Sequence, residues 1–599
     1  MLKFLSYSLF SLIIFVFDLQ AKVSIDGNMQ QWHRLSLTFD GPQTSENDPD
    51  NPFTNYRLDV TFTHNDISYN VPGFYAADGN SGESGAAEGN KWRVFFTPDR
   101  TGEWSYKASF RTGDFLSVSL DDGAGKATAF DGSSGTFMIL KNDVSQEENI
   151  SKGMLRYVGQ HYLQYAGSGE YYIKGGADSP ENFLAYFEFD QTPVSHRYEA
   201  HSRDWREGDP TWQDGKGKNI IASLNYLASK GMNSVYMITM NVMGDGKDVW
   251  PWIDSSERYR FDCSKLAQWE IVFSQMDKLG IMIHLLLSEA ENKNIFEWEE
   301  LKVKSEGFAQ SRRLYYRELI ARFAHHLAIT WNLGEENNMP AGNNAQNYDA
   351  SFPNSDDQRK LFAEYIRSLD PYDHPIVVHN SDWDLFPPLY GNANFEGPSM
   401  QVHDPKDVHV KTLEYVTQSA KNEKKWFVCI DENGHYTTGA KPDKDDPQHD
   451  RMRKEVLWAN LMAGGAGVEW YFGYKYEHND LTCEDWRSRD KLWDQTRYAL
   501  DFFHDYLPFW EMKPNDDLLA SDDAYCFAQE GKIYAVYLPG SGTTQINLKS
   551  NNVFTIHWFN PRTGSKLETG TKDIISGSGF VALGNPPYEE DKDWVVLIK

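Results

Sequence analysis

The stretch ITWNLGEENN, residues 329–338, places two adjacent glutamates directly after a short apolar run. Ile329 and Trp331 alternate with polar residues, which indicates a strand that ends just before Glu335 and Glu336. In parallel α/β sheets, ligands bind beyond the carboxyl ends of the strands. The pair of acids therefore predicts a polar site at this edge of a sheet.

Seven further strand-like runs surround this one, with helical segments between them. Before residue 329, Tyr316, Leu319, Ile320 and Phe323 keep the spacing of a helix packed on one face. Eight such runs are the number expected for a (β/α)8 barrel, and about 32 residues per unit between the fourth and seventh runs suits that fold. The runs are EYYIKGG (170–176), NSVYMITMN (233–241), IMIHLLLSE (281–289), LAITWNLGEE (327–336), PIVVHN (375–380), SMQVHD (399–404), KWFVCIDENG (425–434) and AGVEWYFG (466–473).

The two ends of the chain read as β-rich. In KWRVFFTPDRTGEWSYKASFRTG (91–113), apolar residues alternate on both sides of a Pro- and Gly-containing turn, which predicts a hairpin with one buried face. KIYAVYLPG, NVFTIHWFNPRTG and DWVVLIK are short strands near the C-terminus. We expect a multidomain α/β plus β protein: a β-sandwich at 22–140, the (β/α)8 barrel at 141–512 and a second β-sandwich at 513–599.

The first 21 residues, MLKFLSYSLFSLIIFVFDLQA, have Lys3, an apolar run and a small residue at Ala21, which is typical of a secretory signal peptide. The protein is therefore expected to be secreted or periplasmic, without membrane insertion, because no later run approaches the roughly 20 apolar residues of a span. A net charge of −29 disfavours nucleic acid as a partner. The four cysteines show no metal-ligand spacing, so no metal or other cofactor is expected, and one disulfide stays open.

Hydrolysis of a glycosidic bond needs two carboxyl groups, one to protonate the leaving oxygen and one to attack the anomeric carbon or activate water. Strands four and seven lie on opposite sides of an eight-stranded barrel, and each ends in a pair of acids: Glu335 with Glu336, and Asp431 with Glu432. A lone carboxylate at a strand end is as often a helix cap or the partner of an arginine as it is a catalytic group. Paired acids on facing strands favour a catalytic role over a structural one.

The motifs around these acids resemble those of known glycosidases. WNLGEEN (331–337) resembles the strand-four signature Trp-x-Leu-Gly-Asn-Glu of the retaining (β/α)8 glycosidases of clan A, which implies that Glu336 is the acid/base and puts Glu335 where that pattern has asparagine. FVCIDENGH (427–435) resembles the strand-seven pattern, which implies that Glu432 is the nucleophile. Asp431 is the competing choice; period-two alternation from Val428 favours Glu432.

Most of residues 22–599 also resemble a bacterial group that has an N-terminal domain of unknown function 5060 (DUF5060), an apiosidase-like barrel and a collagen-binding-like C-terminal module. The resemblance rests on VTFTHNDISYNVPGFYAADGN, FTPDRTGEWSYK, YRELIARFAHHLAITWNLGEENN, YAVYLPG and HWFNPRTG. It implies a secreted glycoside hydrolase that cleaves a polysaccharide or its oligosaccharides by a retaining double displacement. Nothing in the residues themselves argues for collagen binding.

Polar and aromatic residues near the two acids are candidates for sugar contacts, although core packing is the commoner role of a tryptophan. The rival hypothesis is a non-catalytic glycan-binding protein or adhesin built on the same barrel; metal-dependent hydrolysis lacks a His-x-His or His-Glu-x-x-His run. The sugar, the oligomeric state and endo or exo action stay open. The candidate substrate-binding residues are Glu335, Asn332, Trp331, Asn380, Trp383, His403, His435, Trp470 and Tyr471.

Overall fold

The computed structural model describes residues 23–143, 149–339, 352–381, 384–540, 542–549 and 551–599. Its centre is a closed barrel of eight parallel strands in sequence order, and each strand overlaps one of the eight predicted runs. The predicted fold class is therefore confirmed. The strands are β12 (Lys174–Ala177), β13 (Ser234–Ile238), β14 (Met282–Leu286), β15 (Ile329–Asn332), β16 (Ile376–His379), β17 (Gly397–Val402), β18 (Cys429–Asn433) and β19 (Gly467–Trp470).

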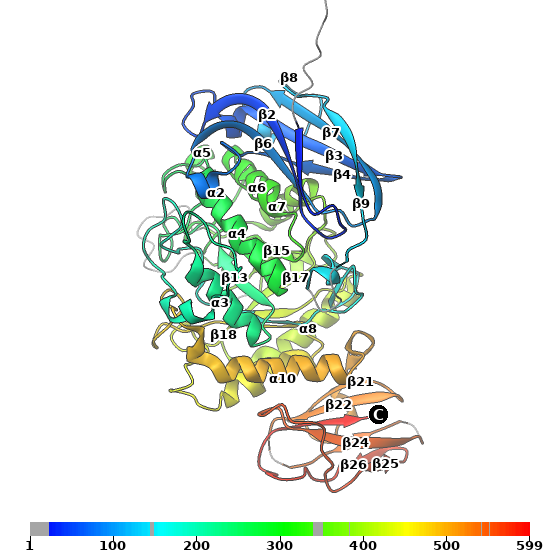
Figure 1. Cartoon of the computed structure of the whole chain (residues 1–599). Coiled ribbons are helices and arrows are strands. Elements are labelled where there is room, and N and C mark those ends of the chain that lie inside the picture. Colours follow the sequence, from blue (N-terminus) through cyan, green and yellow to red (C-terminus); the bar gives the residue numbers. More distant parts are fainter. Residues whose placement is uncertain (1–22, 144–148, 340–351, 382–383, 541, 550) are drawn as a thin grey trace, which may run out of the picture.

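Helices surround the barrel (Figure 1). The predicted apolar face of residues 316–323 lies on α6 and is buried. Local signals fix several helix starts: Asp262 caps α4 by accepting from the backbone N–H of Lys265, and Ser355 and Gln358 form a capping box on α7. The main helices are α3 (Lys218–Ser229), α4 (Cys263–Leu279), α5 (Ile295–Leu301), α6 (Gln310–Phe323), α7 (Asp356–Leu369), α8 (Val408–Lys421), α9 (Trp458–Met462) and α10 (Asp490–Tyr506).

The N-terminal region is a two-sheet sandwich. The predicted alternation is correct, because Trp92, Val94 and Phe96 are all buried. The predicted hairpin is wrong, because the two runs belong to opposite sheets. Period two identifies the buried face of a strand and leaves its partner undetermined. One sheet contains β1 (Val23–Gly27), β2 (Leu35–Ser45), β5 (Phe74–Tyr75) and β6 (Glu88–Phe96); the other contains β3 (Tyr56–His64), β4 (Ile67–Pro72), β7 (Gly102–Thr112), β8 (Lys126–Ala127) and β9 (Ser134–Ile139).

This sandwich packs against the helical shell beside α4, α6 and α7 (Figure 1). Thr97 donates through Oγ1 to the backbone oxygen of His325 at 2.7 Å, and Arg317 of α6 pairs with Asp59 of β3 at 2.7 Å. Arg34 of the sandwich pairs with Glu270 of α4. Buried polar contacts of this kind fix the orientation of the sandwich on the barrel.

The C-terminal region lies next to α10 (Figure 1). Arg453 forms a buried ion pair with Asp593 at 2.8 Å, and Trp458 of α9 stacks on Tyr537 at 5.2 Å between ring centroids. This ion pair and this ring contact fasten the region to the barrel. A six-stranded sheet contains β20 (Lys513–Pro514), β21 (Tyr525–Gln529), β22 (Ile533–Leu538), β27 (Trp594–Ile598), β24 (Val553–Phe559) and β25 (Ile574–Ser576), and a two-stranded sheet contains β23 (Gln545–Asn547) and β26 (Phe580–Ala582).

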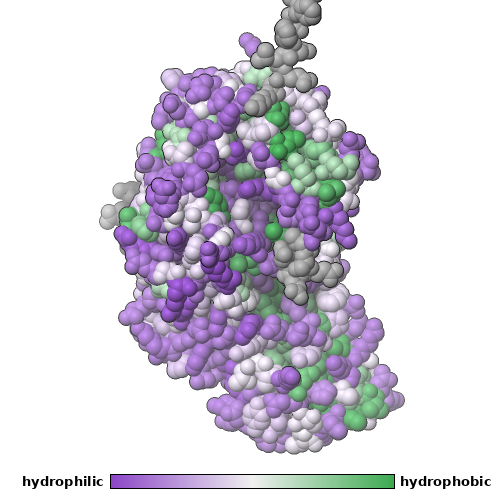
Figure 2. All heavy atoms as spheres, viewed as in Figure 1, coloured by the Kyte–Doolittle hydropathy of each residue, from purple (hydrophilic) through white to green (hydrophobic). Residues whose placement is uncertain are grey.

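Hydrophilic residues dominate the face drawn in Figure 2, as the composition leads one to expect. Cys263, Cys429, Cys483 and Cys526 are all buried and free, so the disulfide left open by the sequence is not present. Within the described residues no helix combines the length and the apolar character that a bilayer crossing requires. The domain limits drawn from the sequence remain predictions.

Candidate active site

A pocket of about 360 Å³ lies at the carboxyl ends of the barrel strands. Glu335 and Glu336, which follow β15, and Glu432, at the end of β18, all line it. The structure therefore brings the acids of strands four and seven to one cavity. Among the described residues, eight carboxyl groups line the pocket: Glu181, Asp245, Glu289, Glu291, Glu335, Glu336, Glu432 and Asp480.

A β-bulge places Glu432 in this pocket. The pairing of β17 with β18 runs from Met400–Ile430 directly to Gln401–Glu432, so Asp431 is the extra residue. Bulges re-aim side chains and are common beside active sites. Simple alternation, the reason given for preferring Glu432 from the sequence, is therefore interrupted at this position.

Asp431 has a different environment from its neighbour. It is fully buried and accepts a hydrogen bond from Lys174 Nζ at 2.8 Å, and the same ammonium contacts Glu469 at 3.2 Å. Although burial lowers the pKa of Lys174, these two carboxylates raise it above its usual value overall. Asp431 does not line the pocket and serves as a buried counter-ion.

A second polar group approaches Glu432 from β16. His379 Nε2 lies 3.5 Å from Glu432 Oε2, and its Nδ1 is 2.9 Å from the hydroxyl of Tyr236 on β13. Burial, with His284 nearby, lowers the pKa of His379 to about 3, so the ring is neutral. The neutral ring therefore brings a polar nitrogen close to the Glu432 carboxylate without adding a charge beside it.

The opposite wall is the loop after β15. Gly334 makes the turn: its φ is +150°, and a Cβ there would stand 2.1 Å from Ser288 Oγ. Glu336 adopts a φ of +38°, a region that non-glycine residues seldom occupy and that is enriched at functional sites. Gln401 Nε2 donates to Glu336 Oε1 at 3.2 Å.

Both glutamates of the opening motif reach the pocket. Strand β15 ends at Asn332, so residues 335 and 336 belong to a loop in which period two no longer applies. Burial, followed by the charges of Glu289, Glu336 and Glu432, raises the pKa of Glu335 well above its usual value. Crowded carboxyl groups share protons, so the cluster titrates as a unit.

Four other predicted contact residues lie in or close to the pocket. His403 and Tyr471 line the pocket. His435 lies exposed near its rim, 6.1 Å from the His403 ring. Asn380 is buried behind the wall, where its Oδ1 accepts from the backbone N–H of Gln401 at 3.0 Å and so positions that residue.

Three predicted contacts are core residues instead. Trp331 is fully buried and donates to Asp370 at 2.9 Å, and Trp470 donates to Thr496 of α10 at 2.9 Å, so both indoles face the helical shell. Asn332 lies inside the barrel, 3.0 Å from His284 Nε2. These three expectations are corrected because side chains within a strand alternate between interior and shell below the mouth. Trp383 lies outside the described residues.

Sequence reasoning missed several lining residues, among them Glu181, Asp245, Gln401 and Tyr474. Gln401 lies within β17, in a run whose polarity drew attention only to its end. Glu181 directly follows the first strand, in ADSPE (177–181), where an acid could have been noticed. The others lie in loops without regular periodicity.

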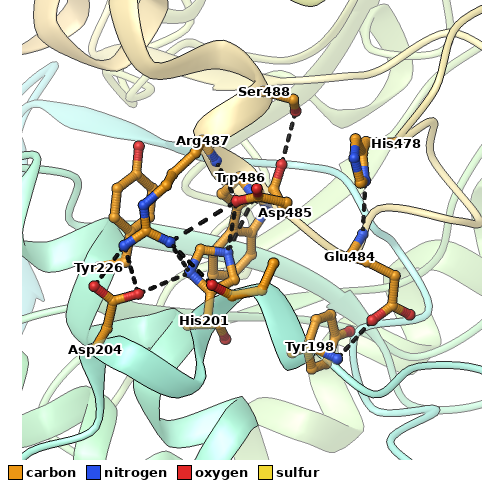
Figure 3. A network of polar contacts seen from close by, with 12 residues as sticks. Tyr198, His201, Asp204, Tyr226, His478, Glu484, Asp485, Trp486, Arg487 and Ser488 are labelled. Atoms are coloured by element: carbon orange, nitrogen blue, oxygen red, sulfur yellow. Dashed lines mark hydrogen bonds and ion pairs between the residues drawn. The ribbon is translucent and has the colours of Figure 1, made fainter.

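One residue of the loop after β19 reaches the pocket: Asp480, which accepts from Ser179 Oγ at 2.6 Å. The rest is tied to the segment around α3 (Figure 3). Arg487 pairs with Asp204, and His201 Nε2 accepts from the backbone N–H of Trp486 at 3.1 Å. This network holds Asp480 at the mouth.

Three groups of acids and histidines within the described chain bring possible ligand atoms within 4.8 Å of one another. Two are structural: His284, Asp431 and Glu469 stand inside the barrel, and Glu270, His325 and His326 lie below the N-terminal sandwich. Of the three groups, only the third, which consists of Asp245, Glu289 and Glu291, lines the pocket.

Comparison with known proteins assigns the flanking regions. Residues 28–111 match the domain of unknown function DUF5060, and residues 514–599 match the "putative collagen-binding domain of a collagenase". The chain carries both domains. The predicted recognition is thereby confirmed for these two regions, whereas the barrel between them is covered by neither match.

Among solved structures, the chain is similar to a "putative glycoside hydrolase" from Bacteroides vulgatus, with 17% identity, a TM-score of 0.64, and 95% of this chain and 99% of that chain covered. A family 5 glycoside hydrolase from the same organism has 15% identity and a TM-score of 0.49, with 75% and 93% covered. No curated protein matches. At 17% identity, the likeness to the first of these structures shows a shared fold and no more.

Proposed function

We propose that the protein is a retaining glycoside hydrolase that cleaves a polysaccharide or its oligosaccharides. The observation that carries the proposal is the convergence of Glu336 and Glu432, from strands four and seven, on one pocket at the mouth of the barrel. Two carboxyl groups across a cleft are the machinery of glycosidic hydrolysis. The fold shared with a structure named as a glycoside hydrolase supports the same assignment.

In the proposed mechanism, Glu432 attacks the anomeric carbon while Glu336 gives its proton to the leaving oxygen. Glu336 then removes a proton from water, which releases the sugar from Glu432 with the starting anomeric configuration. His379 orients the nucleophile from 3.5 Å, and Gln401 orients the acid/base. Glu335 supports Glu336 because two neighbouring carboxyl groups resist becoming charged together, so the pair keeps a proton near neutrality.

We further propose that the protein is exported, on the basis of the signal-like residues 1–21. Detection of a mature chain that begins near residue 22 outside the cytoplasm would support this. An uncleaved chain retained in the cytoplasm would refute it.

The decisive assay measures reducing ends released from a panel of polysaccharides. Wild type should release them from at least one substrate, Glu432→Gln should release none, and the exposed control Glu103→Gln should match wild type. NMR of the first product should show the retained anomer. An adhesin would bind a glycan and release nothing, and an inverted first product would replace the double displacement with single displacement.

A further inference from the structure

The charge of the pocket is one-sided. Eight carboxyl groups line it, and its described lining includes no lysine or arginine. The sequence adjoining that lining, at residues 340–351 and 382–383, contains none either. Lys293 lies buried behind the wall, where its ammonium donates to the backbone oxygen of Ala290. A cleft lined by one sign of charge concentrates ligands of the opposite sign.

The hydrogen-bonding groups of the pocket are equally one-sided. Six lining side chains besides the acids can donate, and four of them already do so within the protein. Tyr471 donates to the backbone oxygen of Tyr436, and Tyr474 donates to Asp245 at 3.2 Å. Ser381 donates to Asn338, and Gln401 to Glu336. The lining therefore has a surplus of acceptors.

One acceptor in this lining has no donor among the described residues. Gln401 is 3% exposed, and its Oε1 has no hydrogen-bond partner within the described residues. A buried acceptor without a partner is costly, so a ligand that brings a donor is favoured at this point. Like the surplus of acceptors, this atom favours a ligand rich in donors, which ammonium and hydroxyl groups supply.

We propose that the cleft takes a sugar with a free, protonated amino group, and that the ammonium binds between Asp245, Glu289 and Glu291. The inference rests on the proposed function and names its substrate class. The three carboxyl groups place ligand atoms within 4.8 Å of one another, and an ammonium carries three donors and no acceptor. Sulfate and carboxylate groups bring only acceptors and negative charge, so sulfated and uronic sugars fit this lining worst.

The titration of these acids agrees with the proposal. Burial and the neighbouring acids Glu291 and Asp245 raise the pKa of Glu289 well above its usual value, and burial and Asp245 raise that of Glu291. A bound cation favours the ionised form of both. Binding of the amine should therefore release protons, which calorimetry in two buffers of different ionisation enthalpy detects.

The test measures binding by calorimetry at pH 7 in a Glu432→Gln background, so that no turnover interferes. The probes are matched pairs of a free-amine sugar and its N-acetylated counterpart: glucosamine, galactosamine and mannosamine, and the glucosamine tetrasaccharide. The proteins are the background itself and its combinations with Asp245→Asn, Glu291→Gln or the exposed control Glu103→Gln.

At least one free amine should bind about tenfold or more tighter than its acetylated partner, with release of protons and weakening by salt. Asp245→Asn and Glu291→Gln should each remove most of that difference, and Glu103→Gln should preserve it. Equal or tighter binding of every acetylated partner, or no binding in any pair, overturns the proposal. The proposal is also overturned if no amine binds and calcium chloride raises the melting temperature of the background but not of its Asp245→Asn variant. Asp245, Glu289 and Glu291 would then be a metal site.

Failure here is separable from failure of the proposed function. If the wild type hydrolyses a neutral glycan while the Glu432→Gln variant binds no amine, the protein is a glycosidase with another substrate. Amine binding by a wild type that hydrolyses no glycan leaves this inference standing and removes the catalytic proposal.

Discussion

Asp431 and Glu432 are neighbours in β18, yet Asp431 pairs with Lys174 inside the barrel whereas Glu432 lines the pocket at its mouth. The bulge opposite Gln401 makes this possible, because it adds one residue to β18 and lets consecutive acids both avoid the helical shell. Asp431 can therefore hold Lys174 in the barrel, and Glu432 can act in the pocket.

The two substitutions should consequently fail in different ways. Glu432→Gln should lower kcat by at least about 1,000-fold with little change in melting temperature, because a nucleophile is lost. Asp431→Asn should lower the free energy of unfolding by about 3 kcal/mol, because it removes a partner of a buried charge. Thermal unfolding and kcat measured on both variants check this; a stable, inactive Asp431→Asn beside an active Glu432→Gln would exchange the two roles.

Asp480 should make the folded state less stable as pH rises. Burial, with Asp245 nearby, raises its pKa to about 7, and its value in the unfolded chain is about 3.9. The folded state therefore binds the proton more tightly, and stability falls between about pH 4 and pH 7 and then levels off, by up to about 4 kcal/mol shared with coupled neighbours. Asp480→Asn should raise the melting temperature at pH 8 and change little at pH 4. Equal effects at both pH values would contradict the shift.

The C-terminal domain should depend on Asp593 for its attachment. This carboxylate is fully buried and accepts from Arg453 through both oxygens, at 2.8 and 2.9 Å. Asp593→Ala should cost about 3–5 kcal/mol of stability, because it leaves the arginine without its buried partner. The exposed control Asp591→Asn should change stability by less than about 0.5 kcal/mol. Denaturant unfolding measures both, and a neutral Asp593→Ala would show that the contact is dispensable.

The barrel could be predicted from the sequence because parallel strands are buried on both faces and read as continuous apolar runs. All eight runs overlap the strand expected of them, and IMIHLLLSE and PIVVHN contain theirs completely. The pairing of β6 and β7 could not be predicted, because alternation does not say which strand lies alongside.

The site was less accessible to sequence reasoning than the fold. Glu336 and Glu432 could be placed at strand ends, but the bulge at Asp431 and the loop conformation at Glu336 depend on tertiary contacts that leave no periodic signal. The tryptophans were misassigned for a related reason. Trp331 shares a motif with Glu335, and Trp470 follows Glu469, but both indoles point into the helical shell and therefore lie away from the mouth.

Glu335 and Glu336 both line the pocket, so the assignment of the acid/base to Glu336 is open to a direct test. Glu336→Ala should lose activity on unactivated substrates by about 100- to 10,000-fold, the usual contribution of a general acid–base group. On an aryl glycoside with a good leaving group, azide should restore its turnover and give a glycosyl azide, because azide attacks the glycosyl-enzyme without a general base. Glu335→Gln should stay active, with the alkaline limb of its pH–rate profile moved to lower pH. Loss of the last proton from the Glu335–Glu336 pair puts two charges side by side, and a neutral glutamine removes that penalty, which lowers the pKa of Glu336. Azide rescue of Glu335→Ala and not of Glu336→Ala would transfer the acid/base role to Glu335, whose raised pKa already suits a protonated acid near neutrality.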